Sequence, residues 1–228
     1  MAASGASLDA AALPQAGRLR ITETFFSLQG EADAVGWPTF FIRLTGCPLR
    51  CGYCDTAYAF HGGEWRAIPA LVDEARDSRA GHVCVTGGEP LAQRGCLELL
   101  RGLCDAGLRV SLETSGALDI SSVDARVTRV VDIKTPASGE VERNRWENLD
   151  LLRGSDQLKL VICDRADYEW ARAQLQSRQL VQRCPVLFSP SHGQLAPAML
   201  AGWILEDRLP VRFQMQLHKA LWGDVPGR

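Results

Sequence analysis

The chain has 228 residues with 46% apolar side chains, and its 25 Lys and Arg against 27 Asp and Glu give a net charge of −2. This length and composition are typical of a soluble globular protein that buries a core of its own. No run reaches the roughly 18 apolar residues of a membrane span, and the near-neutral charge excludes a general nucleic-acid binder. Neither a membrane nor nucleic acid is therefore expected as a direct partner.

The predicted elements begin after a tail of small residues at 1–17, which contains no Lys or Arg and lacks the basic start of a secretory signal. A single domain is expected over 18–228, opening with a strand at Arg18. Apolar runs and helical periodicity then predict, in order, strand 39–44, loop 45–63, helix 68–79, strand 82–85, helix 91–106, strands 109–112 and 129–133, helix 146–153, strand 157–162, helix 167–178, strand 186–189, helix 197–207 and strand 211–217.

Alternating strands and helices of this kind indicate an α/β fold with a mostly parallel sheet. Polar and glycine residues follow four of the predicted strands, at 86–88, 113–116, 134–136 and 189–192. Because the carboxyl ends of parallel strands form the ligand-binding rim of such folds, these four clusters predict a binding site there.

Three of the eight cysteines, Cys47, Cys51 and Cys54, fall within the loop 45–63. A [4Fe–4S] cluster takes four ligands, one per iron, so three local thiolates would leave one iron open. A closed zinc site completed by His61 is the alternative reading. With no secretory signal, we expect reduced thiols and a cytoplasmic location. The scattered cysteines, assigned to packing, are Cys84, Cys96, Cys104, Cys163 and Cys184.

The spacing C-x3-C-x-Φ-C, with Tyr53 as the aromatic residue, resembles the signature of the radical S-adenosylmethionine (SAM) superfamily. The Gly-Gly-Glu-Pro turn at 87–90 is similar to that superfamily's second landmark. The resemblance implies that the three thiolates hold the cluster and that its open iron binds the amino and carboxylate groups of SAM. It also implies SAM contacts from Tyr53, Asp55, Gly87, Gly88, Glu89, Ser115, Asp132, Lys134, Ser189, Pro190, Ser191 and His192.

The resemblance narrows to the family of 7-carboxy-7-deazaguanine synthases, because six segments occur in that family's order: 26–31, 41–47, 54–56, 85–90, 113–116 and 216–219. It implies a trimmed, partial (β/α) barrel of the TIM type, with about six core parallel strands and extra flanking strands. It also implies a lyase of queuosine biosynthesis that converts 6-carboxy-5,6,7,8-tetrahydropterin to 7-carboxy-7-deazaguanine and ammonia. In that reaction a 5′-deoxyadenosyl radical abstracts the C6 hydrogen and the ring contracts.

The same resemblance implies roles toward the substrate. Arg43 would pair with the pterin carboxylate through its planar guanidinium, and Glu31 would read the aminopyrimidine edge. Thr56 would ligate Mg²⁺, which keeps several waters and needs few protein ligands. The implied substrate-binding set is Leu28, Gln29, Gly30, Glu31, Arg43, Thr86 and His218.

The expected partners are a small pterin substrate, an electron donor such as flavodoxin or ferredoxin, and a second copy of the chain in a homodimer. Two other functions stay open at this point. One is a different radical SAM enzyme, such as an activase that acts on a partner protein. The other is a non-catalytic binding module held together by zinc, which would lack the colour of an iron–sulfur cluster.

Overall fold

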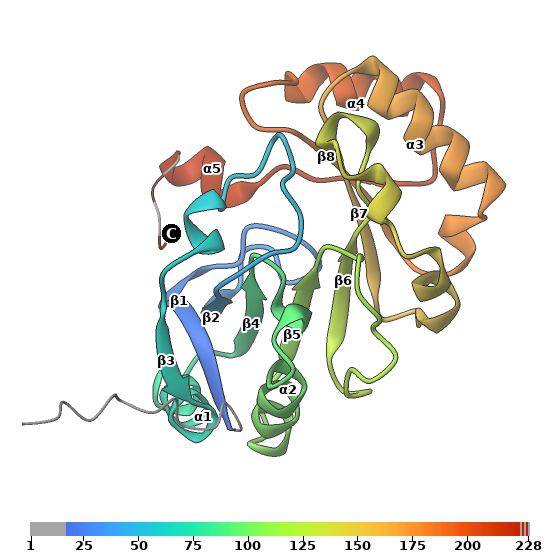
Figure 1. The fold of residues 1–228 in the computed structure, drawn as a ribbon. Coiled ribbons are helices and arrows are strands. Elements are labelled where there is room, and N and C mark those ends of the chain that lie inside the picture. Colours follow the sequence, from blue (N-terminus) through green and yellow to red (C-terminus); the bar gives the residue numbers. More distant parts are fainter. Residues whose placement is uncertain (1–16, 224, 226, 228) are drawn as a thin grey trace, which may run out of the picture.

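The computed structural model describes residues 17–223, 225 and 227, so the predicted tail at 1–17 lies outside the described residues except for Gly17. Its frame is one sheet in the order β3-β1-β2-β4-β5-β6-β7-β8-β9 (Figure 1). The strands are β1 (Arg18–Leu28), β2 (Pro38–Leu44), β3 (Glu64–Ala67), β4 (His82–Gly87), β5 (Val110–Thr114), β6 (Thr128–Asp132), β7 (Gln157–Ile162), β8 (Val186–Pro190) and β9 (Arg212–Phe213). The α-helices are α1 (Ile68–Asp77), α2 (Cys96–Asp105), α3 (Arg165–Ser177), α4 (Pro197–Glu206) and α5 (Leu217–Trp222). The 3-10 helices are η1 (Ala57–Phe60), η2 (Pro90–Ala92), η3 (Pro136–Ser138), η4 (Val141–Arg143), η5 (Trp146–Leu151) and η6 (Leu180–Gln182).

The sheet is mostly parallel and does not close into a full barrel. Strands β2, β4, β5, β6, β7 and β8 run parallel to their neighbours, with the short β9 continuing the series. Strands β1 and β3 flank this core antiparallel to their partners. Figure 1 shows α1 and α2 against the half of the sheet around β1 to β5, and α3 and α4 beside β7 and β8. The predicted partial barrel with six core parallel strands and flanking strands is confirmed.

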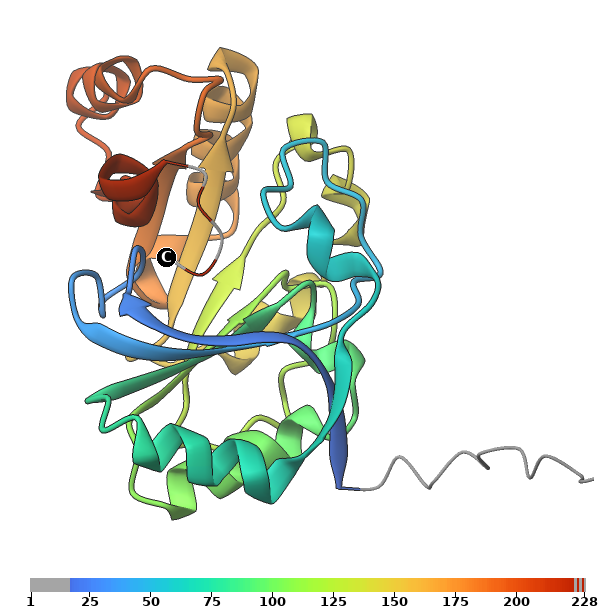
Figure 2. The ribbon, with the colours of Figure 1, turned by 90° about the vertical axis from the view of Figure 1, so that its left-hand side faces the viewer.

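The open side of the sheet is bridged by side chains and loops. Figure 2 shows the β1–β2 hairpin reaching toward the end of the sheet that carries β8 and α5. At the tip, the Gln214 side-chain amide accepts a hydrogen bond from the Ala32 backbone N–H at 2.7 Å and donates to its carbonyl at 3.1 Å. The Leu217 N–H donates to the Gly30 carbonyl at 2.9 Å. The hairpin loop is thereby held to the segment that follows β9, which closes one wall of the interior.

The core follows from the apolar patterning of the sequence. The predicted stripe on α2 is buried on one face, and the strand β4 is buried along its whole length. An Asp164 cap starts α3 by accepting from the Asp167 N–H at 2.8 Å, and α1 and α4 each carry a proline in the first turn. Four of the scattered cysteines are buried and Cys163 is half-buried, all as free thiols, which agrees with their assignment to packing.

Two predicted helices differ from what is found. The helix expected at 91–106 is divided into η2 and α2, because the Gln93 side chain between them bonds the Arg20 backbone N–H and carbonyl, both at 2.8 Å. The helix expected at 146–153 is the 3-10 helix η5, where the buried Asn148 amide donates to the Leu118 carbonyl at 2.8 Å. In both places a side-chain amide bonds the backbone of a distant segment and interrupts regular α-helix.

Two strands also differ. The strand expected at 211–217 shrinks to the two residues of β9, because Gln214 turns to the hairpin loop and α5 begins at Leu217. Strand β3 was not predicted, because it has only four residues and most of them are exposed. It forms by pairing with the edge of β1. No helix in the described ranges combines the length and the apolar character that crossing a membrane requires. The division into a tail at 1–17 and one domain at 18–228 stays a prediction.

Candidate active site

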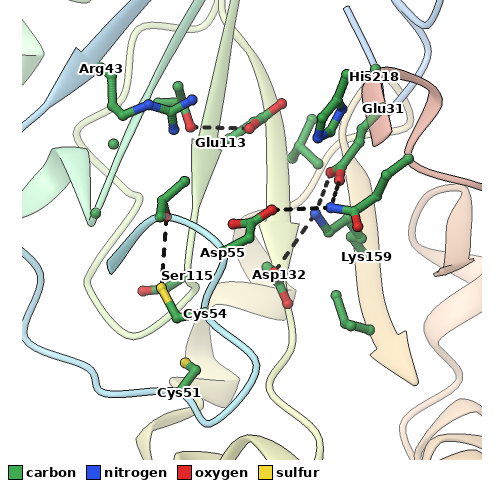
Figure 3. Close-up of a pocket in the computed structure, with 18 of the residues that line it drawn as sticks. Glu31, Arg43, Cys51, Cys54, Asp55, Glu113, Ser115, Asp132, Lys159 and His218 are labelled. Carbon is green, nitrogen blue, oxygen red and sulfur yellow. Dashed lines mark hydrogen bonds and ion pairs between the residues drawn. The ribbon is translucent and has the colours of Figure 1, made fainter. Parts of the chain in front are cut away.

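A cavity of about 580 Å³ lies on the inner side of the sheet, walled by the β1–β2 hairpin, the loop 45–63, the ends of β4 to β7, and α5. Figure 3 shows Cys51 and Cys54 at one end of this cavity and Glu31 and His218 at the other, with Asp132 between them. The predicted site residues that line it are Leu28, Gln29, Gly30, Glu31, Arg43, Cys47, Cys51, Tyr53, Cys54, Asp55, Thr56, Thr86, Gly87, Gly88, Ser115, Asp132, Lys134, Ser191, His192 and His218. Glu89, Ser189 and Pro190 are not among the lining residues.

The three clustered cysteines are free, half-buried thiols that line the same cavity. Their loop is fixed by backbone hydrogen bonds, among them Gly46 N–H to the Ala59 carbonyl at 2.8 Å and Gly52 N–H to the Ser138 carbonyl at 2.9 Å. Among the described residues, no three His, Cys, Asp or Glu side chains gather closely enough to hold a single metal ion, and His61 is exposed and outside the cavity lining. Closure of a zinc site by His61 would require that residue to move, whereas a [4Fe–4S] cluster needs only the three thiols that already line the cavity.

Burial raises the pKa of the Cys51 thiol to about 11, and it also raises the pKa of the Cys47 thiol. Both thiols are therefore protonated at neutral pH when no metal is bound. Because metals are held by thiolates, loading of this loop releases protons. Assembly of a metal centre is consequently favoured by higher pH.

The glycine pair at the end of β4 lies directly against the cysteine loop. A side chain on Gly87 would meet the Leu44 carbonyl oxygen at 2.5 Å, and one on Gly88 would meet the Cys47 Cβ at 2.8 Å as well as the Gly46 carbonyl. The Glu89 N–H donates to the Gly46 carbonyl at 2.8 Å. Only glycine allows the turn to approach the loop this closely.

Replacing Gly88 by alanine is therefore expected to push the cysteine loop away and to lower the iron bound after anaerobic reconstitution severalfold. Iron and sulfide analysis of the purified variant measures this. Gly154→Ala is the control, since nothing lies within 4 Å of the added methyl group there. Equal iron content in the Gly88 variant and the wild type would show that the close approach is not required.

Glu89 lies behind the cavity wall and is fully buried. Its carboxylate accepts from the Leu91 N–H at 3.0 Å, from the Thr114 hydroxyl at 2.9 Å and from the Ser115 N–H at 2.7 Å. These bonds join the turn after β4 to the end of β5 and position Ser115 at the rim. A direct contact from Glu89 to SAM stays a prediction.

Asp132 and Lys134, at the end of β6, form a charged part of the wall near the cysteine loop. Lys134 Nζ lies 3.1 Å from Asp132 Oδ2 and 5.8 Å from the centre of the Tyr53 ring. Burial would lower the pKa of Lys134, but Asp132 and Cys51 outweigh it and raise that pKa. Asp132 Oδ1 is buried without a hydrogen-bond partner among the described residues, so a polar ligand in the cavity would satisfy it.

Only part of the segment 189–192, at the end of β8, lines the cavity. Ser189 and Pro190 are the last residues of β8 and are buried, whereas Ser191 and His192 line the cavity. The Ser191 N–H donates to the Ile162 carbonyl at 2.8 Å, which ties this rim to the end of β7. Contacts from Ser189 and Pro190 to SAM stay predictions, and the positions of Ser191 and His192 allow such contacts.

The far end of the cavity holds a buried ion pair between Glu31 and Lys159. The Gln216 side chain donates to Glu31 Oε1 at 2.8 Å, and Lys159 Nζ lies 4.0 Å from Asp132 Oδ2. Burial would raise the pKa of Glu31, but the charge and hydrogen bond of Lys159 outweigh it and hold that pKa at about 2. Glu31 is therefore a fixed negative charge at every physiological pH.

A second carboxylate, Glu113 on β5, lies between the two ends. It accepts from the Gln29 amide and from the Thr86 hydroxyl, each at 3.1 Å. Burial, and after it the negative charge of Glu31, raises the pKa of Glu113. The wall therefore offers two carboxylates of unequal basicity, together with an amide and a hydroxyl, to a flat polar ligand.

His218 of α5 closes the cavity over Gly30. The Gly30 position has no room for a side chain, because the His218 ring occupies that space. Burial lowers the pKa of His218, so its ring is neutral at neutral pH. Val225 and Gly227 also line the cavity, so the chain beyond α5 contributes to the wall.

Comparison with known proteins agrees with this geometry. Residues 41–131 match the model of the radical SAM superfamily. The 7-carboxy-7-deazaguanine synthase of Chlorobaculum tepidum is 44% identical over 90% of this chain and 94% of its own length. The chain belongs to the 7-carboxy-7-deazaguanine synthase family. The synthase of Koribacter versatilis is 42% identical over 90% of this chain and 97% of its own.

The fold agrees with that of a solved structure. The crystal structure of QueE from Escherichia coli superposes with a TM-score of 0.72 at 22% identity, covering 88% of this chain and 95% of that chain. The open, mostly parallel sheet described above is thus also the fold of that protein.

Several residues that line the cavity were not predicted from the sequence. Lys159 is the most important, and its signal is a single charged side chain inside the otherwise uncharged strand β7. Glu113 and Gln216 also line the cavity. Both belong to segments that carry the family resemblance, but no role was predicted for either. Tyr58, in η1, gave no sequence signal, because its partners Glu23 and Arg43 lie on strands β1 and β2.

Proposed function

We propose that this chain is a lyase that converts 6-carboxy-5,6,7,8-tetrahydropterin to 7-carboxy-7-deazaguanine and ammonia, in the route to queuosine. The observation that carries the proposal is that the three thiols of the cysteine loop and the polar side chains suited to a carboxypterin line one cavity. Membership of the synthase family at 44% identity supports the same reaction.

The residues present suit a [4Fe–4S] cluster and SAM. Cys47, Cys51 and Cys54 would hold three irons, and the uncompensated Asp132 Oδ1 and the Tyr53 ring would receive SAM beside them. When bound, the cluster and SAM supply the radical that removes the substrate's C6 hydrogen. The chain's own part is to orient both partners and to exclude water and other hydrogen donors.

The opposite end of the cavity would bind the pterin. The Glu31 carboxylate, held ionised by Lys159, would accept hydrogen bonds from the aminopyrimidine N–H groups. The Gln29 side-chain amide and the Thr86 hydroxyl, which donate to the Glu113 carboxylate in this structure, would form hydrogen bonds with the pterin ring. Arg43 would pair with the 6-carboxylate, a contact for which its planar fork of donors is suited.

Three further features belong to this proposal. The Thr56 hydroxyl lines the cavity 3.7 Å from Cys54 Sγ and would ligate Mg²⁺ together with substrate oxygens and waters. A flavodoxin or ferredoxin would supply the electron. The enzyme would act as a cytoplasmic homodimer.

Anaerobically reconstituted protein, supplied with dithionite, SAM, Mg²⁺ and the carboxytetrahydropterin, is expected to form 7-carboxy-7-deazaguanine, which mass spectrometry detects. Chelation of Mg²⁺ is expected to slow product formation severalfold. Intact substrate beside a fully assembled cluster would contradict the proposed reaction. Hydrogen abstraction from a protein instead of the pterin would favour an activase.

A further inference from the structure

Arg43 lies opposite an acidic residue because strand β1 is irregular. The register of the β1–β2 pair shifts between Ile21 and Glu23, which leaves one extra residue on β1 and places Glu23 directly across from Arg43. Bulges of this kind turn side chains to new directions and are common beside active sites. Here the bulge brings a carboxylate onto the same face as the guanidinium that lines the cavity.

One carboxylate oxygen of Glu23 accepts hydrogen bonds from both Arg43 and Tyr58. Glu23 Oε1 accepts from Arg43 Nε at 2.8 Å and from the Tyr58 hydroxyl, also at 2.8 Å. The guanidinium carbon lies 5.8 Å from the centre of the Phe25 ring and 5.9 Å from that of Tyr58. The side chains of Arg43 and Glu23 are 13% and 22% exposed, so this contact is mostly shielded from water.

The contact leaves the outer end of the guanidinium for a ligand. Within the described part of the chain, the Arg43 side chain donates one hydrogen bond, from Nε to Glu23, so its two terminal nitrogens keep their N–H groups for the cavity. Figure 3 shows this terminal group directed toward Glu113. A guanidinium held at Nε and flanked by two rings has one orientation, and paired terminal N–H groups match a carboxylate.

We infer that Glu23 and Tyr58 are positioning residues that fix Arg43 for the carboxylate of the substrate, an inference that rests on the proposed function. Tyr58 lies in η1, within the loop that carries the cluster cysteines. The tyrosine hydroxyl therefore links the ordering of that loop to the group that recognises the substrate's acid. Neither residue needs to touch the substrate for this role.

The positioning role predicts the opposite of a simple charge effect. A negative charge beside Arg43 on its own would weaken binding of an anionic ligand, so its removal would tighten binding. If Glu23 instead fixes the orientation of Arg43, loss of the acceptor weakens binding, and an amide that keeps the acceptor restores it. Glu23→Ala and Glu23→Gln separate the two cases.

The experiment uses the cluster-loaded, SAM-bound enzyme and two stable probes, 6-carboxypterin and pterin, which differ only in the carboxylate. Glu23→Ala is expected to weaken binding of 6-carboxypterin about tenfold, the size of a lost hydrogen bond to a charged group. Tyr58→Phe, which keeps the ring, is expected to weaken it about threefold. Glu23→Gln should stay within about threefold of the wild type, and pterin should bind all variants equally.

Tyr168→Phe, which removes a hydroxyl bonded to Asp207 at 2.7 Å between α3 and α4, is the matched control and should change neither affinity. Unchanged or tighter binding of 6-carboxypterin by Glu23→Ala would overturn the inference, as would equal losses for both probes. If Glu23→Ala does not fold, the Tyr58→Phe result decides in the same way. Wild-type enzyme that binds 6-carboxypterin no better than pterin would instead count against the proposed function.

Discussion

Replacing Cys51 by alanine is expected to abolish both the brown colour of the reconstituted protein and the formation of product. Cys51 is a half-buried thiol that lines the cavity together with Cys47 and Cys54. A cubane cluster takes one ligand per iron and this loop supplies three of the four, so a chain with two local thiolates holds the cluster poorly. Bound iron, measured with visible absorption, is expected to fall from about four atoms per chain to near zero.

The matched control for this variant is Cys104→Ala, which removes a buried thiol from α2 outside the cavity. Its packing loss is expected to cost about 1 kcal/mol while iron content and activity stay at wild-type levels. A Cys51→Ala protein that keeps a full complement of iron would contradict the three-thiolate assignment.

Replacing Lys159 by methionine is expected to lower the free energy of unfolding by about 3 kcal/mol and to weaken pterin binding strongly. The substitution leaves Glu31 as a buried charge without its partner, which costs far more than loss of an exposed ion pair. The Gln216 amide, at 2.8 Å, is then the remaining hydrogen-bond donor to that carboxylate among the described side chains. Chemical denaturation and pterin titration measure the two effects.

The pH dependence of this variant has a defined sign. In the wild type the pKa of Glu31, about 2 against an ordinary 4.5, means that the pair stabilises fully above pH 4.5 and that this stability is lost as the pH falls toward 2. Without Lys159, burial raises the pKa of Glu31 above its ordinary value. The deficit of the variant is therefore largest at neutral pH and shrinks in acid, where Glu31 becomes protonated.

Two further proteins test the origin of this deficit. Arg76→Met breaks an exposed pair with Asp73, at 3.5 Å, and should change stability by less than about 0.5 kcal/mol. The double variant Lys159→Met with Glu31→Gln removes the unpaired charge and should be more stable than Lys159→Met alone. If the double variant is the less stable of the two, the buried charge of Glu31 is not the cause.

Much of the fold was predictable because it depends on local patterns. Strand β7 has the predicted bounds, and α2 buries the stripe that its apolar periodicity defines. The cysteine loop also stands out in the sequence, since Cys47, Cys51 and Cys54 are close together and their spacing is specific, and their binding of a cluster stays a prediction. The family predicted from the sequence is confirmed by relatives that are 44% and 42% identical over 90% of this chain.

The parts that could not be predicted depend on contacts between distant segments. Lys159 pairs with Glu31 across 128 positions, and the Tyr58 hydroxyl reaches Glu23 across 35. The break before α2 depends on Gln93, which bonds the backbone of a strand 73 residues away. A single sequence carries no periodic signal for such pairs, because each is made by one side chain in the folded state.

The proposal that the cysteine loop holds a cluster with one iron open to SAM is tested most directly by paramagnetic resonance of the reduced, reconstituted enzyme with SAM labelled with ¹⁵N at its amino group. The account predicts a change of the cluster spectrum when SAM is added and a hyperfine coupling to the labelled nitrogen. A cluster spectrum that SAM leaves unaltered, with no coupling to the label, would contradict it.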